Sequence, residues 1–223
     1  VKSANDIALS LAETVSGSEE RFVAEMNKMA RSMGLSATHF VNAHGLHAAG
    51  QVTSARDLAV LTLYLQRDFP EFMPIFTTES VTLGKAKYPS NNGLIGHFAG
   101  ATGMKTGYVC ASGLNIVATA ERNGRSLIAV VLGASSARER NERAAELLLR
   151  GFSGAYAADG NTVLSLANAA APPTDMRPLI CGKQAKDYVK GREAAYPMGL
   201  KGQPSYLTDL IEGPTHVATD LGI

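Results

Sequence analysis

The sequence predicts an α+β fold: helices come first, an antiparallel β-meander follows, and a further helix packs against it. Two observations lead to this prediction. Apolar residues recur at helical spacing in three stretches between residues 6 and 65, which are separated at Gly17 and by the loop-like residues 36–53. Residues 114–121 and 126–133 are rich in Val, Ile, Leu and Ala and are joined through Asn123-Gly124, a strong hairpin signal. Helical and strand segments that do not alternate favour an antiparallel sheet over a parallel βαβ arrangement.

Three helices are expected in the N-terminal part. The first covers residues 6–15 and stops at Gly17, and its apolar positions are Ile7, Leu11 and Val15. The second begins after Ser18 as N-cap and ends at Gly34. Its buried stripe is expected to comprise Phe22, Val23, Met26, Met29, Ala30 and Met33. The third begins at residues 54–57, which are similar to a capping box, and its apolar face is Leu58, Leu61 and Leu65.

The strands are expected in the middle of the chain. Residues 104–109 should form the strand before the hairpin, which completes an antiparallel meander. A short strand is expected at Val81 and Leu83, and an amphipathic helix at 137–150 that stops at Gly151. The inward residues of that helix are predicted to be Ala144, Leu147 and Leu148. Its outward residues are predicted to be Arg138, Glu139, Arg140 and Glu142.

Three regions follow from this pattern. Residues 1–153 form the main domain, residues 154–175 read as a linker, and residues 176–223 form an irregular C-terminal extension. The 223-residue chain has a net charge of +1, which gives no reason to expect nucleic acid as a partner. No apolar run is long enough to span a bilayer, and no basic amphipathic stripe suggests a membrane anchor in this chain.

The two cysteines leave two interpretations open. Cys110 and Cys181 are either separate buried thiols or a single disulfide, which requires an oxidising compartment. A disulfide over a loop of this length stabilises a protein by about 4 kcal/mol in the chain-entropy description. Two thiols cannot complete a four-ligand zinc site, and His39, His44 and His47 are not spaced along one helix face, so no metal is predicted.

Two short motifs carry the chemistry. Ser3-Ala4-Asn5 opens the first helix, and Lys105-Thr106-Gly107 lies on the strand before the hairpin. Read alone, Ser3 could be an N-cap and Lys105 a solvated lysine. Between the motifs lie the sequences Thr-His-Phe-Val-Asn-Ala-His-Gly-Leu at 38–46 and Thr-Ser-Ala-Arg-Asp-Leu-Ala at 53–59. With these flanks, residues 1–152 resemble the serine-type D-alanyl-D-alanine carboxypeptidases, the low-molecular-mass penicillin-binding proteins.

The resemblance implies a penicillin-binding-protein or serine β-lactamase-like fold and a role for each motif residue. Lys105 and Thr106 would hold the terminal carboxylate of the substrate, and Gly107 would let the peptide backbone lie along the strand. The N–H of Tyr108 would donate to the oxyanion. Ser3 would help to pass a proton to the leaving D-alanine, and Asn5 would hold the substrate amide. His44 matches a histidine beside the cleft. No cofactor is implied.

The Ser-x-x-Lys motif that should carry the nucleophile is absent, since no serine of the chain is followed by lysine three residues later. We therefore expect it on an N-terminal segment of the same protein that precedes Val1. The resemblance implies peptidoglycan pentapeptides as substrate, β-lactams as ligands, and the bacterial periplasm or envelope as location. Two alternatives remain: a non-catalytic peptidoglycan-binding module, and a serine β-lactamase-like hydrolase. If a bond joins Cys110 and Cys181, it holds the C-terminal extension near the mouth of the active site.

Overall fold

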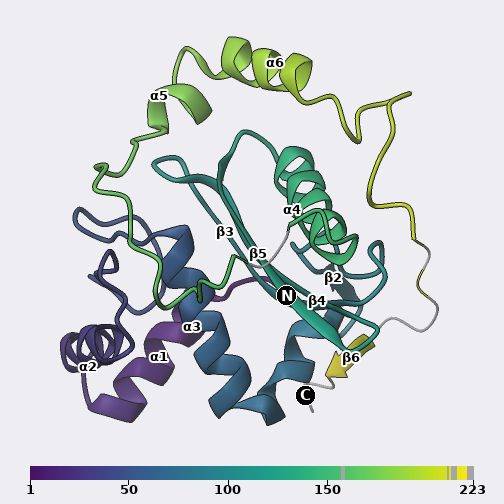
Figure 1. Cartoon of the computed structure of the whole chain (residues 1–223). Coiled ribbons are helices and arrows are strands. Elements are labelled where there is room, and N and C mark those ends of the chain that lie inside the picture. The colour runs from purple at the N-terminus through teal and green to yellow at the C-terminus, as the bar shows by residue number, and fades with distance from the viewer. Residues whose placement is uncertain (157–158, 210, 212–214, 220–223) are drawn as a thin grey trace. The chain divides into compact units, whose positions relative to one another are not determined.

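The structure is a computed structural model of the chain and describes residues 1–156, 159–209, 211 and 215–219. The chain divides into two compact units. Unit 1 comprises Val1–Lys2, Asp68–Ala157 and Asp175–Ile223, and unit 2 comprises Ser3–Arg67 and Ala158–Thr174. Figure 1 labels the helices and strands of both.

Unit 2 contains the three predicted helices, which are confirmed as α1 (Asn5–Ser16), α2 (Glu19–Ser32) and α3 (Ala55–Asp68). The Ser18 side chain caps α2 by accepting a hydrogen bond from the N–H of Arg21 at 3.3 Å. Gly17 ends α1 in the left-handed conformation, with a φ of 79°. Local signals therefore suffice to place these boundaries.

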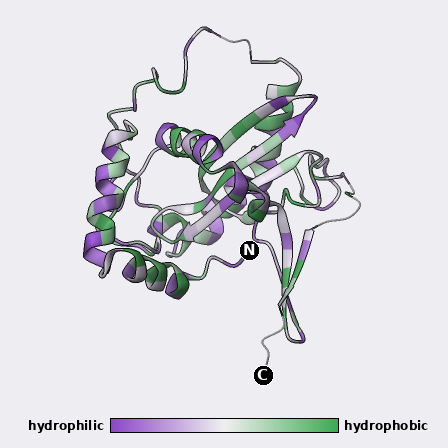
Figure 2. Ribbon diagram, turned by 90° about the horizontal axis from the view of Figure 1, so that it is seen from below, coloured by the Kyte–Doolittle hydropathy of each residue, from purple (hydrophilic) through white to green (hydrophobic). Residues whose placement is uncertain are grey.

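The packing of these helices differs from the prediction. Of the apolar positions of α1, only Ala12 is buried, while Ile7, Leu11 and Val15 are 56%, 60% and 69% exposed. Met29 was expected inside α2 but is 56% exposed. Asn27 is buried instead, because its side-chain amide donates to and accepts from the backbone of Phe40. That pair of hydrogen bonds turns a polar position of α2 inward. Figure 2 colours the chain by hydropathy and shows hydrophobic and hydrophilic residues side by side along the helices.

A buried carboxylate organises the polar part of unit 2. Asp57 is 1% exposed and accepts hydrogen bonds from the N–H of Ala37, the hydroxyl of Thr38 and the amide of Asn168. Burial alone would raise the pKa of Asp57, but the hydrogen bonds from Asn168, Arg56, Thr38 and Ala37 lower it. Asn168 lies in the stretch that the sequence describes as a linker, so this stretch makes specific contacts with unit 2.

Replacement of Asp57 by asparagine is expected to lower the free energy of unfolding by about 2–3 kcal/mol, because an amide cannot satisfy four donors. Urea denaturation followed by circular dichroism measures this change. The exposed Asp187→Asn serves as the matched control and should change the stability by less than about 0.5 kcal/mol. Equal effects of the two substitutions would contradict the structural role of Asp57.

Unit 1 is built on the predicted antiparallel meander. Strands β3 (Ala101–Val109), β4 (Gly113–Arg122) and β5 (Arg125–Ala134) form one sheet in that order. Asn123 and Gly124 have φ values of 52° and 72°, so they form the tight turn that their sequence predicts. A second sheet contains β1 (Thr78–Leu83), β2 (Ala86–Pro89) and β6 (Thr215–Thr219), in the order β2-β1-β6. A 3₁₀ helix, η1 (Pro70–Thr77), precedes β1.

The core of unit 1 lies between the meander and α4 (Ala137–Phe152), which Figure 1 shows packed against the sheet. It contains Leu94, Phe98, Ile116, Ala118, Ala120, Ala129, Val131, Ala134, Ala144, Ala145 and Leu148. Ala144 and Leu148 are buried as predicted, but Leu147 is 37% exposed. Gly151 lies inside α4, and the left-handed glycine beyond its end is Gly154, with a φ of 77°.

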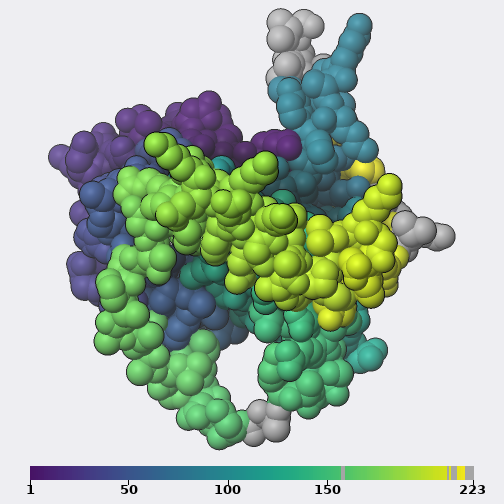
Figure 3. Space-filling view, turned by 90° about the horizontal axis from the view of Figure 1, so that it is seen from above, coloured from purple at the N-terminus to yellow at the C-terminus, as the bar shows by residue number. Residues whose placement is uncertain are grey.

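The C-terminal extension contains regular elements that the sequence pattern did not indicate. It contains α5 (Arg177–Ile180), α6 (Ala185–Ala195) and β6, which pairs in parallel with β1. We name residues 175–209 the C-terminal strap; in Figure 3 they form a continuous band of light green and yellow side chains. The strap contacts the polar face of α4, since Arg192 pairs with Glu139 and the N–H of Tyr206 donates to Glu142. For this reason Glu139 and Glu142, which were predicted to face outward, are only 0% and 3% exposed, and Arg138 is half-buried. Arg140, also predicted to face outward, is 5% exposed and donates to the carbonyl of Asn91.

Candidate functional site

The predicted Lys-Thr-Gly motif lies on β3, at the edge of the meander. β3 pairs with β4, and no other described strand pairs with it. Lys105, Gly107 and Tyr108 are exposed, and Thr106 is half-buried. A Cβ built on Gly107 has no other atom within 4 Å, so the backbone is open at this point. An extended peptide can therefore approach this edge closely.

Lys105 lies near a second cation, Arg140. The pKa of Lys105 is lowered, because its ammonium group is partly removed from water and is repelled by the charge of Arg140. The ammonium group donates a hydrogen bond to the carbonyl of Thr106. Arg140 comes from the first turn of α4, and its guanidinium donates to the carbonyl of Asn91 at 2.7 Å. Two positive charges that lie close together and are partly removed from water favour the binding of an anion.

Arg140 was not recognised in the sequence as a site residue. It was predicted to lie on the outer face of α4, between other charged residues. Helical periodicity could not separate it from Arg138 or Arg143, because its contact with Asn91, 49 residues earlier, is not visible in a local pattern. Arg140 is distinguished only by its tertiary environment: the residue is 5% exposed, and burial lowers the pKa of its guanidinium.

Tyr108 is fixed at the end of β3 by the two cysteines. Cys110 and Cys181 form a disulfide across 71 residues, with a Cα–Cα distance of 5.7 Å. The hydroxyl oxygen of Tyr108 lies 3.3 Å from the sulfur of Cys181 and 3.8 Å from that of Cys110. Of the two interpretations of the cysteines, the structure has the disulfide, which joins the strap to the turn after β3.

The Ser-x-Asn motif lies in unit 2. Asn5 is the first residue of α1, and its side-chain amide donates to the carbonyl of His44 at 2.6 Å. The His44 ring lies 3.6 Å from a carboxylate oxygen of Glu19. Ser3 precedes the N-cap, which is Ala4, and has a φ of 57°. A non-glycine residue in the left-handed region costs about 1–2 kcal/mol and is typical of functional sites.

The structure thus groups the predicted site residues within each unit. Asn5 and His44 are in contact in unit 2, and Ser3 lies two residues before Asn5. The residues of the Lys-Thr-Gly motif, Tyr108 and the disulfide are together in unit 1, with Arg140 added. Within the described residues, no group of three His, Cys, Asp or Glu side chains is arranged to hold a metal ion. None of the helices in the described part of the chain is both long and apolar enough to cross a membrane.

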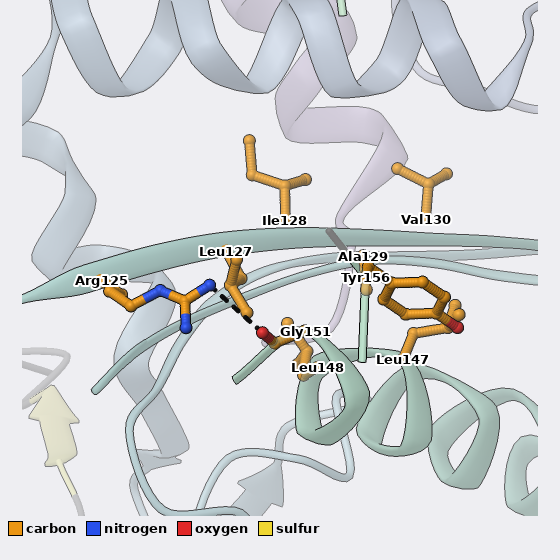
Figure 4. Close-up of a pocket in the computed structure, with 9 residues that line it drawn as sticks. All are labelled: Arg125, Leu127, Ile128, Ala129, Val130, Leu147, Leu148, Gly151 and Tyr156. Carbon is orange, nitrogen blue, oxygen red and sulfur yellow. Dashed lines mark hydrogen bonds between the residues drawn. The ribbon is translucent and has the colours of Figure 1, made fainter. Parts of the chain in front are cut away.

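A pocket lies elsewhere in unit 1, between β5 and α4 (Figure 4). Its walls are mainly apolar, and the Arg125 guanidinium points to the carbonyl of Gly151 at 3.2 Å. Leu127 points toward α4, whereas Ile128 and Val130 point to the other side of β5. It contains none of the predicted site residues and no nucleophile, so the β3 edge remains the candidate site.

The sequence and the fold of the chain are similar to those of known proteins. The model of a peptidase family, S11, described as D-alanyl-D-alanine carboxypeptidase, matches residues 1–136. The D-alanyl-D-alanine carboxypeptidase DacD of Escherichia coli K12 is 40% identical over 149 residues, which are 66% of this chain and 38% of the relative. The structure of penicillin binding protein 5 from Haemophilus influenzae matches with a TM-score of 0.65 and 38% identity, over 68% of this chain and 44% of that chain.

The structure of penicillin-binding protein D2 from Listeria monocytogenes in its cefotaxime-bound form also matches. Its TM-score is 0.62 and its identity is 37%, over 67% of this chain and 62% of that chain. These likenesses confirm the predicted α+β, penicillin-binding-protein-like fold. The chain spans 38% of the length of the E. coli relative.

Proposed function

The chain belongs to the S11 peptidase family of D-alanyl-D-alanine carboxypeptidases, and on this premise we propose that it forms the substrate-binding part of a serine enzyme that removes the terminal D-alanine from peptidoglycan stem peptides. The observation that carries the proposal is the β3 edge. It combines an open backbone at Gly107 with two cations, Lys105 and Arg140, as the binding of a peptide with a free carboxylate requires.

The roles along β3 follow from the chemistry of that substrate. The terminal carboxylate binds near Lys105, supported by the charge of Arg140 and the hydroxyl of Thr106. The peptide backbone lies against Gly107, where a side chain would obstruct it. The N–H of Tyr108 donates to the oxygen of the scissile carbonyl, on which negative charge develops in the tetrahedral intermediate.

The roles in unit 2 concern the proton and the amide. Ser3 passes a proton toward the nitrogen of the leaving D-alanine, and Asn5 holds the amide of the substrate. The hydrogen bond from Asn5 to the carbonyl of His44 supports the orientation of the Asn5 side chain. His44 therefore acts as a positioning residue, itself held by Glu19.

The nucleophile comes, in this proposal, from an N-terminal segment with the Ser-x-x-Lys motif, which no serine of this chain provides. Its lysine accepts the serine proton while the serine oxygen bonds to the carbonyl carbon of the penultimate D-alanine. The bond to the terminal D-alanine breaks, and this residue leaves as a protonated amine. Water then attacks the ester, which releases the shortened peptide and restores the serine. No cofactor takes part.

The exposed apolar face of α1 supports such a segment. The side chains of Ile7, Leu11 and Val15 are spaced four residues apart, and each is more than half exposed. Burial of such apolar side chains stabilises a protein. A helix of the N-terminal segment that packs on this face would bring the nucleophile close to Ser3. The disulfide further supports a location in the periplasm or cell envelope, since such bonds persist in oxidising compartments.

Covalent labelling with a fluorescent penicillin tests the proposal. β-Lactams imitate the acyl-D-Ala-D-Ala end and acylate the same serine. We expect no label on the 223-residue chain alone, and one label per molecule on the protein extended by its N-terminal segment. Replacement of the Ser-x-x-Lys serine by alanine in the extended protein is the control and should abolish the label.

Each outcome has a distinct meaning. Labelling of the isolated chain would refute the assignment of the nucleophile to another segment. An extended protein that binds muropeptides but takes no label would favour the non-catalytic binding module. Rapid release of the label, within seconds, would favour a β-lactamase-like hydrolase over a carboxypeptidase.

A further inference from the structure

A third cation is linked to Arg140 through one asparagine. The ammonium nitrogen of the exposed Lys2 lies 3.4 Å from the side-chain oxygen of Asn91, which comes 89 residues later in the chain. The backbone carbonyl of the same Asn91 accepts a hydrogen bond from the Arg140 guanidinium at 2.7 Å. Lys2, Asn91 and Arg140 all belong to unit 1. Asn91 therefore holds two cations, one with its side chain and one with its backbone.

The loop that carries Asn91 is fixed by its neighbours. Asn92 is 6% exposed, and its side-chain oxygen accepts a hydrogen bond from the N–H of Leu94 at 3.1 Å. The Leu94 side chain is fully buried in the core of unit 1. A Cβ on Gly93 would lie 2.1 Å from the side-chain nitrogen of Asn141, so the lack of a side chain at Gly93 lets the loop approach α4 closely. Buried contacts thus set the position of Asn91.

The charges of Lys2 and Arg140 remain available to a ligand. The Arg140 guanidinium also donates to the side-chain oxygen of Asn141, at 3.0 Å. The hydrogen-bond partners that the structure describes for Lys2 and Arg140 are therefore neutral amide groups. An amide oxygen orients a cation without cancelling its charge, whereas a carboxylate would do both.

Lys2 lies near Lys105 as well. Burial lowers the pKa of the Val1 amino group, and the charges of Lys105 and Lys2 lower it further. A like charge acts in this way only at short range, so both lysines lie near the same nitrogen atom. Because Arg140 in turn lies near Lys105, three positive charges gather beside the Lys-Thr-Gly motif.

We propose that Lys2 is a third cation of the site that binds the terminal carboxylate of the substrate, and that Asn91 is the positioning residue that holds Lys2 beside Arg140. This inference rests on the proposed function, in which Lys105 binds that carboxylate. Lys2 acts through its charge, which attracts the anionic end of the peptide. Its contribution therefore depends on the ionic strength.

Release of D-alanine from diacetyl-L-Lys-D-Ala-D-Ala by the protein extended by its N-terminal segment tests the role of Lys2. In Lys2→Met, kcat/KM should fall roughly three- to tenfold at about 20 mM salt, through a higher KM at unchanged kcat. In 1 M salt the Debye length is about 3 Å, so the variant and the unmodified protein should then differ by less than about twofold. Lys2→Arg keeps the charge and should retain at least about half of the activity at low salt.

Asn91→Ala tests the positioning role. The substitution removes the side-chain oxygen that holds Lys2 but keeps the backbone carbonyl that holds Arg140. At low salt it should reproduce part of the loss seen in Lys2→Met. In a protein that already carries Lys2→Met, it should cause no further loss, because Asn91 acts through Lys2. Two losses that multiply in the double variant would contradict the role of Asn91.

Lys85→Met is the matched control, because Lys85 is exposed in the turn between β1 and β2 of the same unit. Its kcat/KM should stay within about twofold of the unmodified protein at both salt concentrations. Equal kcat/KM of Lys2→Met and Lys85→Met at low salt, or a loss in Lys2→Met that persists in 1 M salt, would overturn the inference. Absence of D-alanine release by the unmodified extended protein would instead refute the proposed function, and the role of Lys2 with it.

Discussion

Replacement of Lys105 by methionine is expected to lower kcat/KM for D-alanine release by about 100-fold or more in the protein extended by its N-terminal segment. Methionine keeps most of the side-chain length but removes the charge that binds the terminal carboxylate. Loss of one partner of a desolvated charge pair costs about 2–5 kcal/mol, and each 1.4 kcal/mol is a factor of ten. Arg140 remains close by, so binding should be weakened rather than abolished.

The exposed lysine of β2 provides the control for this experiment. Lys87→Met removes the same charge from the same unit and should leave kcat/KM unchanged within about twofold. Thermal unfolding of both variants should be close to that of the unmodified protein, which separates lost binding from lost folding. Equal activity of Lys105→Met and Lys87→Met would exclude the β3 edge as the carboxylate site.

Replacement of Glu139 by glutamine is expected to have the largest effect on stability, a loss of about 3 kcal/mol in the free energy of unfolding. The Glu139 side chain is fully buried and accepts hydrogen bonds from the N–H and hydroxyl of Ser135 at 3.0 and 2.7 Å. It also pairs with Arg143 at 2.9 Å and with Arg192. Glutamine leaves these two cations without a counter-charge and turns its own donors toward them.

Urea denaturation at pH 7 measures this loss, with the exposed Glu13→Gln of α1 as the matched control. The control should change the stability by less than about 0.5 kcal/mol. A loss below about 1 kcal/mol in Glu139→Gln would show that the strap does not depend on this carboxylate.

The same residue predicts how stability depends on pH. Burial would raise the pKa of Glu139, but hydrogen bonds from Arg192, Ser135 and Arg143 lower it from 4.5 to about 2. Because the pKa is depressed in the folded state, the stabilisation is fully present above pH 4.5 and is lost as the pH falls toward 2. The unfolding free energy of Glu139→Gln should therefore fall less steeply over this interval than that of the unmodified protein.

Much of the local structure was predictable because its signals lie close together in the chain. The turn at Asn123-Gly124 needs positive φ at both residues, and few other pairs adopt it readily. Ser18 and Gly17 mark helix ends because each satisfies or redirects backbone groups within four residues. These rules depend on neighbouring residues alone, so the three helices and the meander agree with the prediction.

The errors share a different cause, which is burial by residues distant in sequence. Glu139, Arg140 and Glu142 have the periodicity of a solvated helix face, yet the strap buries the two carboxylates, and Arg140 is buried in a contact with Asn91. Met29 is exposed because Asn27 takes the inward position in its bond with Phe40. Hydrophobic patterning assumes that polar residues face water, and it cannot detect a polar partner elsewhere in the chain.

By itself, the sequence determined the order and spacing of the Ser-x-Asn and Lys-Thr-Gly motifs, the strand that carries the second, and the family to which they belong. Such features are properties of short segments, whose conformations and chemistry depend on local residues. Only the tertiary structure decided that Arg140 lies near Lys105, that Cys110 bonds to Cys181, and that Cys181, near the start of the strap, lies beside Tyr108. These features depend on contacts across tens of residues, which form only when the core brings the segments together.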